Sequence, residues 1–158
     1  MILYHGSNTS FDQIDLTKSL PNKDFGKGFY LSDTYEQAEE MAKFKVVISG
    51  SNVIVQSYHT EDSILDDDSL KIKIFKEYTQ EWAEFILANR NNNSEVPVHD
   101  YDIVYGPIAN DKVGMQIRKY KDGSINFEEF LHRLQYMKGI TFQYFFGTDK
   151  AINKLRKL

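Results

Sequence analysis

The segment 24–32, which reads DFGKGFYLS, has the composition of one wall of a slot for a flat ligand. Gly26 and Gly28 let the backbone turn tightly and let a bulky group come close, because they carry no side chain. The residues that follow have the composition of a short strand, and an aromatic ring at its mouth can stack on a ligand. The alternative is an ordinary hairpin turn into a core strand, with Phe29 and Tyr30 pointing to opposite faces.

Two further polar side chains lie on predicted strands. His5 ends an opening strand over residues 2–5, just before the turn signal at residues 6–8, where a side chain can face a cleft. Gln143 lies on an aromatic-rich strand predicted for residues 141–146. An imidazole and an amide can each orient a ligand hydroxyl through hydrogen bonds. Each is more often a structural residue when it stands alone.

The strands that must position these side chains are short and are separated by irregular segments and helices. Apolar residues alternate with polar ones along several of them, as expected for half-buried strands. Besides the opening strand and the one after the glycines, strands are predicted for residues 53–59, 70–74, 101–105 and 141–146. The acidic run at 61–68 lacks the glycine and ligand spacing of a calcium loop and is interpreted as a solvated loop.

Four helices are predicted around these strands. Asp33 caps the first, over about residues 34–46, and Asn126 caps the third, which ends at Gly139. The other two cover residues 77–90 and 148–158. Strands and helices do not alternate regularly, so the pattern predicts an α+β fold in a single domain over residues 1–158.

The composition fits an ordinary folded domain. Hydrophobic residues make up 41% of the chain and charged ones 27%, a balance that excludes a disordered chain. The formal charge of −4 argues against a general electrostatic grip on nucleic acid, which requires clustered lysines and arginines. The chain has no cysteine, which excludes disulfides, thiolate metal sites and a cysteine nucleophile. The histidines lack metal-site spacing, so no metal is predicted.

No segment resembles a secretion signal or a membrane anchor. The first residues, MILYH, lack the basic segment and the long apolar run of a signal peptide. No run approaches the roughly 20 apolar residues that cross a bilayer. We therefore expect a soluble, cytoplasmic protein without a membrane partner.

Taken together, His5-Gly6, the stretch 26–32 and Gln143 resemble the split active site of the ADP-ribosyltransferase superfamily, in its His-Tyr-Glu branch. More closely, the chain resembles the bacterial DUF3990 family over nearly its whole length. The supporting segments are residues 3–7, 24–30, 81–90, 101–109 and the strand of Gln143 with the helix after it. The resemblance implies an ADP-ribosyltransferase-like split β-sheet core with flanking helices.

The resemblance also implies that NAD is bound, as a co-substrate, in a bent conformation. Tyr30 would stack on the nicotinamide, the backbone of Gly6 would hydrogen-bond its carboxamide, and His5 would donate to a ribose hydroxyl on the adenosine side. Ser32 would help to hold the nicotinamide end, and Lys27 would approach the diphosphate. The complete set of implied NAD-binding residues is His5, Gly6, Ser7, Gly26, Lys27, Gly28, Tyr30 and Ser32.

The third catalytic position departs from the superfamily pattern. The resemblance implies His5, Tyr30 and Gln143 as the catalytic residues, but the wider superfamily has a glutamate where this chain has Gln143. An amide cannot act as a base or supply a full negative charge beside an oxocarbenium-like ribose. Either the acceptor is a good nucleophile, or another acid such as Asp24 or Asp102 assists, or NAD is bound with little turnover.

The resemblance therefore predicts a mono-ADP-ribosyltransferase that moves ADP-ribose from NAD to a macromolecular acceptor and releases nicotinamide. The acceptor is a protein or a nucleic acid, and family analogy indicates a bacterial toxin or defence effector with an antitoxin or regulatory protein as partner. Two alternatives stay open. One is an NAD glycohydrolase that uses water as the acceptor, and the other is a catalytically weak module that binds NAD or a nucleotide.

Overall fold

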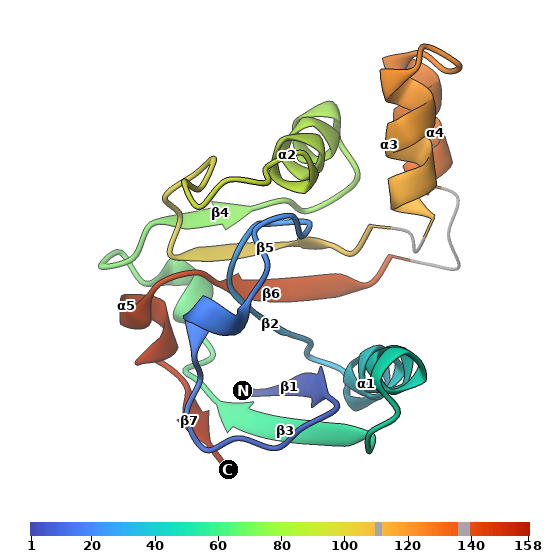
Figure 1. The fold of residues 1–158 in the computed structure, drawn as a ribbon. Coiled ribbons are helices and arrows are strands. Elements are labelled where there is room, and N and C mark those ends of the chain that lie inside the picture. Colours follow the sequence, from blue (N-terminus) through green and yellow to red (C-terminus); the bar gives the residue numbers. More distant parts are fainter. Residues whose placement is uncertain (110–111, 136–139) are drawn as a thin grey trace.

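Two β-sheets form the framework of the domain, and the computed structural model describes residues 1–109, 112–135 and 140–158 of it. The smaller sheet is antiparallel, with the strands in the order β1-β3-β7 (Figure 1). Its strands are β1 (Ile2–Ser7), β3 (Ile54–His59) and β7 (Arg156–Lys157). Both termini of the chain therefore lie at this sheet.

The larger sheet has the strand order β2-β6-β5-β4, in which only the β4–β5 pair is parallel. Its strands are β2 (Phe29–Leu31), β6 (Phe142–Phe146), β5 (Ile103–Pro107) and β4 (Ile72–Ile74). Between the sheets, β1 meets β2 at an isolated bridge between Tyr4 and Ser32. Each of these two residues donates its N–H to the other's carbonyl, at 2.7 and 2.8 Å. A single bridged pair joins the sheets here, so β1 and β2 diverge from this point.

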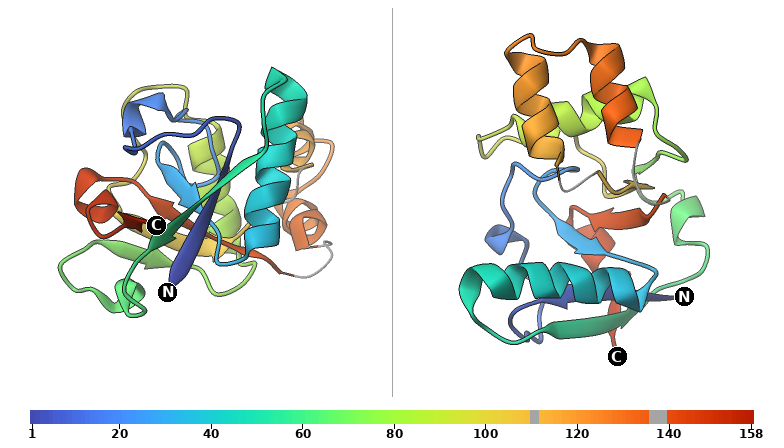
Figure 2. Two further views of the ribbon diagram at one scale, coloured as in Figure 1. Left: turned by 90° about the horizontal axis from the view of Figure 1, so that it is seen from below. Right: turned by 90° about the vertical axis from the view of Figure 1, so that its right-hand side faces the viewer.

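Helices cover the outer faces of both sheets. The helix α1 (Tyr35–Ser49) lies along β1, and α2 (Gln80–Arg90) lies over the larger sheet (Figures 1 and 2). A pair of helices, α3 (Val113–Lys121) and α4 (Phe127–Gln135), stands side by side beyond α2. The remaining short elements are α5 (Asp149–Ile152) and the 3-10 turns at Leu16–Lys18 and Ile64–Asp66.

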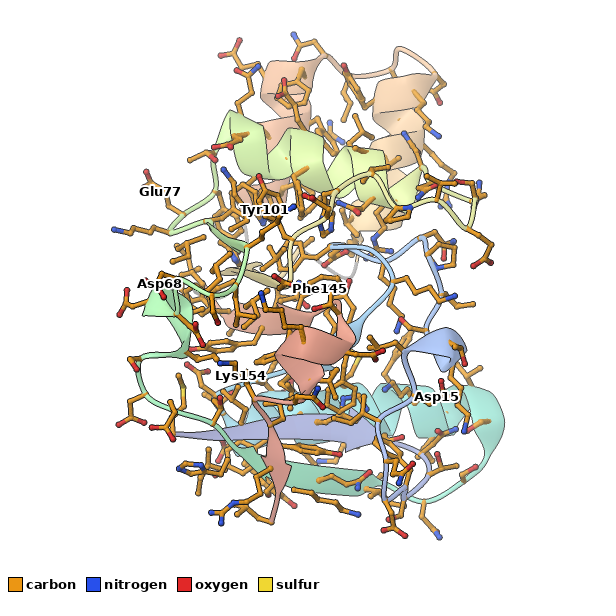
Figure 3. All side chains as sticks on the ribbon, turned by 90° about the vertical axis from the view of Figure 1, so that its left-hand side faces the viewer. Asp15, Asp68, Glu77, Tyr101, Phe145 and Lys154 are labelled. Atoms are coloured by element: carbon orange, nitrogen blue, oxygen red, sulfur yellow. The ribbon has the colours of Figure 1, made fainter. Side chains whose placement is uncertain are left out.

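Two apolar clusters fill the two sides of the larger sheet. One lies between this sheet and the helices α2, α3 and α4 and includes Trp82 and Phe145, with Tyr30 packed against it. Figure 3 shows Phe145 and Tyr101 in the space between β6 and α2. The other cluster lies between the two sheets and includes Phe29 and its neighbours on β1, β3 and β6. Because side chains alternate along a strand, β2 presents Phe29 and Tyr30 to opposite cores, as the hairpin alternative predicted.

Two of the predicted helices differ from the structure. The predicted C-terminal helix over 148–158 is wrong beyond Ile152, because Arg156 and Lys157 pair with β3 as a strand. The N-cap of the first helix is one residue later than predicted: it is Thr34, not Asp33, and no side chain forms a capping hydrogen bond there. The cap at Asn126 is confirmed, since its Oδ1 accepts the N–H of Glu129 at 2.8 Å.

The pattern missed one helix entirely, and part of another prediction lies outside the described residues. No helix was predicted where α3 runs, since its apolar positions are few and Gly114 in its first turn weakens a helical pattern. The predicted end of the third helix at Gly139 falls outside the part of the chain that the structure describes. These differences leave the α+β class unchanged.

Candidate functional site

The candidate site lies where β1 and β2 separate beyond the Tyr4–Ser32 bridge. Continuing that antiparallel register by two residues brings Gly6 opposite Tyr30. Backbone groups of alternate residues point to the same edge of a strand, so Gly6, like Tyr4, turns its N–H and C=O away from β3. The peptide groups of Gly6 therefore face the gap toward Tyr30, and Lys45 donates its Nζ to the Gly6 carbonyl at 2.6 Å.

The absence of a side chain at Gly6 has a structural cause. A Cβ at this position would lie 1.8 Å from the carbonyl oxygen of Ala38, in the first half of α1. The helix therefore packs directly on the strand backbone, with the small side chains of Ala38 and Ala42 buried against it. Lys45 follows Ala42 by three residues and shares that face of the helix, which brings its stem to Gly6.

Tyr30 is held by hydrogen bonds to the loop that precedes it. Its hydroxyl donates to the carbonyl of Gly26 at 2.7 Å and accepts the N–H of Phe25 at 3.0 Å. Burial, and then the charge of Asp24, raise the pKa of Tyr30 well above its usual value, so the phenol stays protonated and keeps donating. The ring packs edge-on against Phe145, with centroids 5.4 Å apart.

A cation lies over one face of the Tyr30 ring. The Nζ of Lys23 lies over the ring, 5.3 Å from its centroid, which is within the range of a cation–π contact. The ring face under Lys23 is thus attractive to positive charge. The nicotinamide of NAD is itself a pyridinium cation, so it would meet the same electrostatic environment as Lys23.

We expect Tyr30→Phe to separate the structural role of the hydroxyl from the role of the ring. The change leaves the carbonyl of Gly26 and the N–H of Phe25 without their partner, which should lower the free energy of unfolding by about 1–3 kcal/mol. The ring itself remains in place. Urea denaturation measures the stability, and titration with NAD measures binding. A variant as stable as the wild type would contradict the assigned role of the hydroxyl.

The glycine stretch owes its glycines to contacts within the protein. Gly26 has φ of +94°, a left-handed conformation that residues with side chains rarely adopt. A Cβ at Gly28 would lie 2.1 Å from the ring of Phe145. Neither position therefore requires a ligand to explain its glycine, in agreement with the hairpin alternative.

Three other predicted NAD-binding residues have partners within the protein. The hydroxyl of Ser7 accepts the N–H of Thr9 at 3.2 Å. The hydroxyl of Ser32 accepts the N–H of Thr34 at 3.1 Å, at the start of α1. Lys27 pairs with the exposed carboxylate of Glu95 at 3.1 Å.

His5 lies on the other side of β2 from the Tyr30 ring. Its ring stacks on Phe29, with centroids 4.2 Å apart, and its Nδ1 lies 2.7 Å from the backbone carbonyl of Tyr30. A carbonyl only accepts, so Nδ1 carries the hydrogen and Nε2 is left as an acceptor. Burial, and then the charge of Lys45, lower the pKa of His5 to about 3. The neutral imidazole can therefore accept a ribose hydroxyl through Nε2, whereas the resemblance implied that it donates.

The pKa of His5 predicts a specific pH dependence of stability. Its folded pKa of about 3 lies below the ordinary histidine value of 6.5, so the unfolded chain binds more protons between these limits. The free energy of unfolding should therefore decrease as the pH is lowered through this window, by up to roughly 1.4 kcal/mol per pH unit from this group. In His5→Asn, an amide that does not titrate can still donate to Tyr30. Urea denaturation at a series of pH values should show the variant gaining on the wild type below pH 6.5; parallel curves would contradict the assignment.

Gln143 belongs to a polar cluster on the same face of the larger sheet as Tyr30. Tyr30 pairs with Phe145, and side chains two residues apart share a face, so Gln143 lies on that face too. Its Nε2 donates to Oδ2 of Asp24 at 3.2 Å, and Nε of Arg90 donates to Oδ1 of the same carboxylate at 2.7 Å. A carboxylate only accepts, so it must bind the NH₂ end of the amide, which leaves Oε1 of Gln143 free to accept a hydroxyl.

Of the two acids considered as helpers for Gln143, the structure brings only Asp24 to it. Asp102 lies at the other end of β5, four residues from Gly106, which pairs with Gln143. At about 3.3 Å per residue, that places the two some 13 Å apart along the strands. The carboxylate of Asp102 accepts the N–H of Lys71 and the hydroxyl of Thr148, so it has a structural role.

The structure links the three predicted catalytic residues only through neighbouring groups, because the His5 side chain lies on the opposite face of β2 from the side chains of Tyr30 and Gln143. The imidazole of His5 contacts the backbone of Tyr30, and Gln143 contacts Asp24 in the loop that the Tyr30 hydroxyl fixes. Sequence reasoning missed Lys23 and Lys45, which lie at the gap, because no motif marks them. Arg90, the last residue of α2, pairs with Asp24.

Two surface hollows lie away from the predicted catalytic residues. One hollow of about 490 Å³ is lined by β1, β3 and the C-terminus, and one of about 600 Å³ by residues 13–17 and 147–149. Neither is lined by His5, Tyr30 or Gln143. Within the described residues, no group of three or more histidine or acidic side chains is placed to hold a metal ion. No helix among them is both long and apolar enough to span a bilayer.

A family model described as "Protein of unknown function (DUF3990)" matches residues 1–157. The chain belongs to the DUF3990 family. No curated protein and no solved structure matches the chain. Membership confirms the DUF3990 resemblance, while the relation of this DUF3990 domain to the ADP-ribosyltransferases stays a prediction that its site geometry must support.

Proposed function

We propose that this DUF3990 domain is an NAD-dependent mono-ADP-ribosyltransferase that transfers ADP-ribose to a macromolecular acceptor. The observation that carries the proposal is the gap between β1 and β2, where the register of the Tyr4–Ser32 bridge sets the peptide groups of Gly6 toward residue 30. A carboxamide can exchange two hydrogen bonds with a peptide group while its aromatic ring stacks on a phenol. In this proposal the backbone of Gly6 binds the carboxamide and the ring of Tyr30 stacks on the nicotinamide.

The residues around the gap have distinct roles in this reaction. The glycosidic bond of NAD breaks, its electron pair stays on the nicotinamide nitrogen, and neutral nicotinamide leaves. The acceptor forms the new bond to the ribose carbon and loses a proton. Oε1 of Gln143 accepts a ribose hydroxyl, and Asp24 positions the amide by binding its NH₂ end. Nε2 of His5 accepts a second ribose hydroxyl.

A domain that binds NAD with little turnover is the second candidate. The carboxylate of Asp24 is bound by the guanidinium of Arg90 and is 7% exposed, so little of its negative charge is left for an oxocarbenium ion. Gln143 has no charge to add. A third candidate, NAD glycohydrolase activity, differs from the first only in using water as the acceptor.

Titration with NAD and an assay of nicotinamide release distinguish the three candidates. Release that requires cell lysate supports transfer to a macromolecule, release by the protein alone supports hydrolysis, and binding without release supports the binding module. Absence of NAD binding would reject all three. Mass spectrometry of the lysate then decides whether the acceptor is a protein or a nucleic acid.

The biological setting that we propose follows the family analogy. A small bacterial transferase acting on a macromolecule in the cytoplasm fits a toxin or defence effector, and such an enzyme requires an antitoxin or another regulatory protein. Co-expression tests this: growth should stop when the domain is expressed alone, and a neighbouring gene product should restore it.

A further inference from the structure

Two lysine side chains occupy the gap without an acidic partner. Lys45 reaches it from α1 and donates to the carbonyl of Gly6, and Lys23 reaches it from the loop before β2 and lies over Tyr30. Within the parts of the chain that the structure describes, neither lysine forms an ion pair with a carboxylate. Asp24 lies close to Lys23, but Arg90 and Gln143 bind its two oxygens.

The contrast with Lys43 shows how unusual these two positions are. Lys43 lies two residues before Lys45 on the exposed side of α1 and pairs with Glu39 at 2.7 Å, which raises its pKa. Burial, and then the charge of Lys23, lower the pKa of Lys45 to about 8. Burial lowers the pKa of Lys23 as well. Two half-buried ammonium groups near each other are unfavourable unless an anion joins them.

The surroundings of the two lysines favour a ligand with concentrated negative charge. The nearby imidazole of His5 cannot supply the missing anion, and its pKa is lowered by burial first and then by the charges of Lys45 and Lys23. An ammonium on a flexible four-carbon stem is a common binder of phosphate, because it acts as a mobile point charge. The diphosphate diester within a dinucleotide carries two negative charges, which match the two cations. Lys27, the lysine expected at this position, already pairs with Glu95.

We propose that Lys23 and Lys45 together form a diphosphate-binding subsite at the gap between β1 and β2. The assignment of this diphosphate to NAD rests on the proposed function. On binding, Lys45 leaves the carbonyl of Gly6 and Lys23 leaves the face of Tyr30, so the movement that binds the phosphates also opens both contacts for the nicotinamide.

Inorganic pyrophosphate and ADP test this subsite without any glycosidic bond to break. Calorimetric titration of the wild type should detect binding of both. Lys23→Met and Lys45→Met each remove one charge-assisted contact and should weaken binding about tenfold or more. Lys43→Met is the matched control from the same helix and should bind within about twofold of the wild type. Thermal melts establish that each variant is folded.

The outcomes separate the subsite from the proposed function. If both probes fail to bind, or bind equally well to Lys23→Met and Lys45→Met, the subsite is rejected. The same follows if Lys27→Met loses binding while these two variants keep it. Lysine-dependent binding of pyrophosphate without any NAD binding would retain the subsite and reject the proposed function. Nicotinamide release that is unchanged in Lys45→Met would reject the subsite and retain the proposed function. Lys45→Arg keeps the charge and should restore binding if Lys45→Met loses it.

Discussion

Gly6→Ala is expected to abolish the native fold. The added methyl group would lie 1.8 Å from the carbonyl oxygen of Ala38 and 2.9 Å from the backbone nitrogen of Ala42. Both neighbours are backbone atoms of α1, so no side chain can rotate to make room, and the whole helix would have to move off β1. We expect a loss of more than about 4 kcal/mol in the free energy of unfolding, which is a large part of the stability of a domain this size.

Circular dichroism and urea denaturation measure this loss, and Gly114→Ala is the matched control. Gly114 lies in α3, where an added Cβ would meet no atom of the described residues within 4 Å outside its own helix backbone, and its φ is not positive. Alanine is a better helix former than glycine, so the control should be as stable as the wild type or gain up to about 1 kcal/mol. A folded Gly6→Ala variant with near-normal stability would mean that α1 does not rest on the backbone of β1.

Gln143→Met is expected to have the largest effect on the proposed reaction. It keeps the length of the side chain but removes the acceptor Oε1 and the donor that binds Asp24. Loss of one positioned hydrogen bond at a reacting centre lowers turnover by about a hundredfold or more, so nicotinamide release should fall by that order. Gln80→Met, on an exposed helix position paired with Glu84, is the control and should leave release unchanged.

Gln143→Glu tests whether negative charge is the missing component. The new carboxyl would face Oδ2 of Asp24, and repulsion between two carboxylates raises the pKa of one of them, although Arg90 offsets part of this. Release should therefore exceed that of the wild type only where the new group is ionised, and the gain should increase with pH. A rate equal to the wild type at every pH would place Gln143 away from the reacting ribose.

Local chemistry accounts for the features that the sequence predicted correctly. These features depend on residues that are neighbours in the chain: the turn and strand of 24–32, the cap at Asn126 and the alternating strands. They appear in the structure with small shifts of their ends. The C-terminal segment was mispredicted as helix because its composition permits a helix, while pairing with β3, including the bond from Leu158 to Ser57, outweighs that preference.

The arrangement of the site depended on contacts between residues far apart in the chain. From the sequence alone, His5, Tyr30 and Gln143 could be named by their resemblance to a family, but not their faces or partners. Only the tertiary structure brings Gln143 to Asp24, 119 residues away, and Lys45 to Gly6, 39 residues away. No local pattern encodes such contacts, because each one arises from the packing of a helix or a loop against a distant strand. The residue types were thus determined by the sequence, while the tautomer of His5, the acceptor end of Gln143 and the two lysines at the gap were decided by the fold.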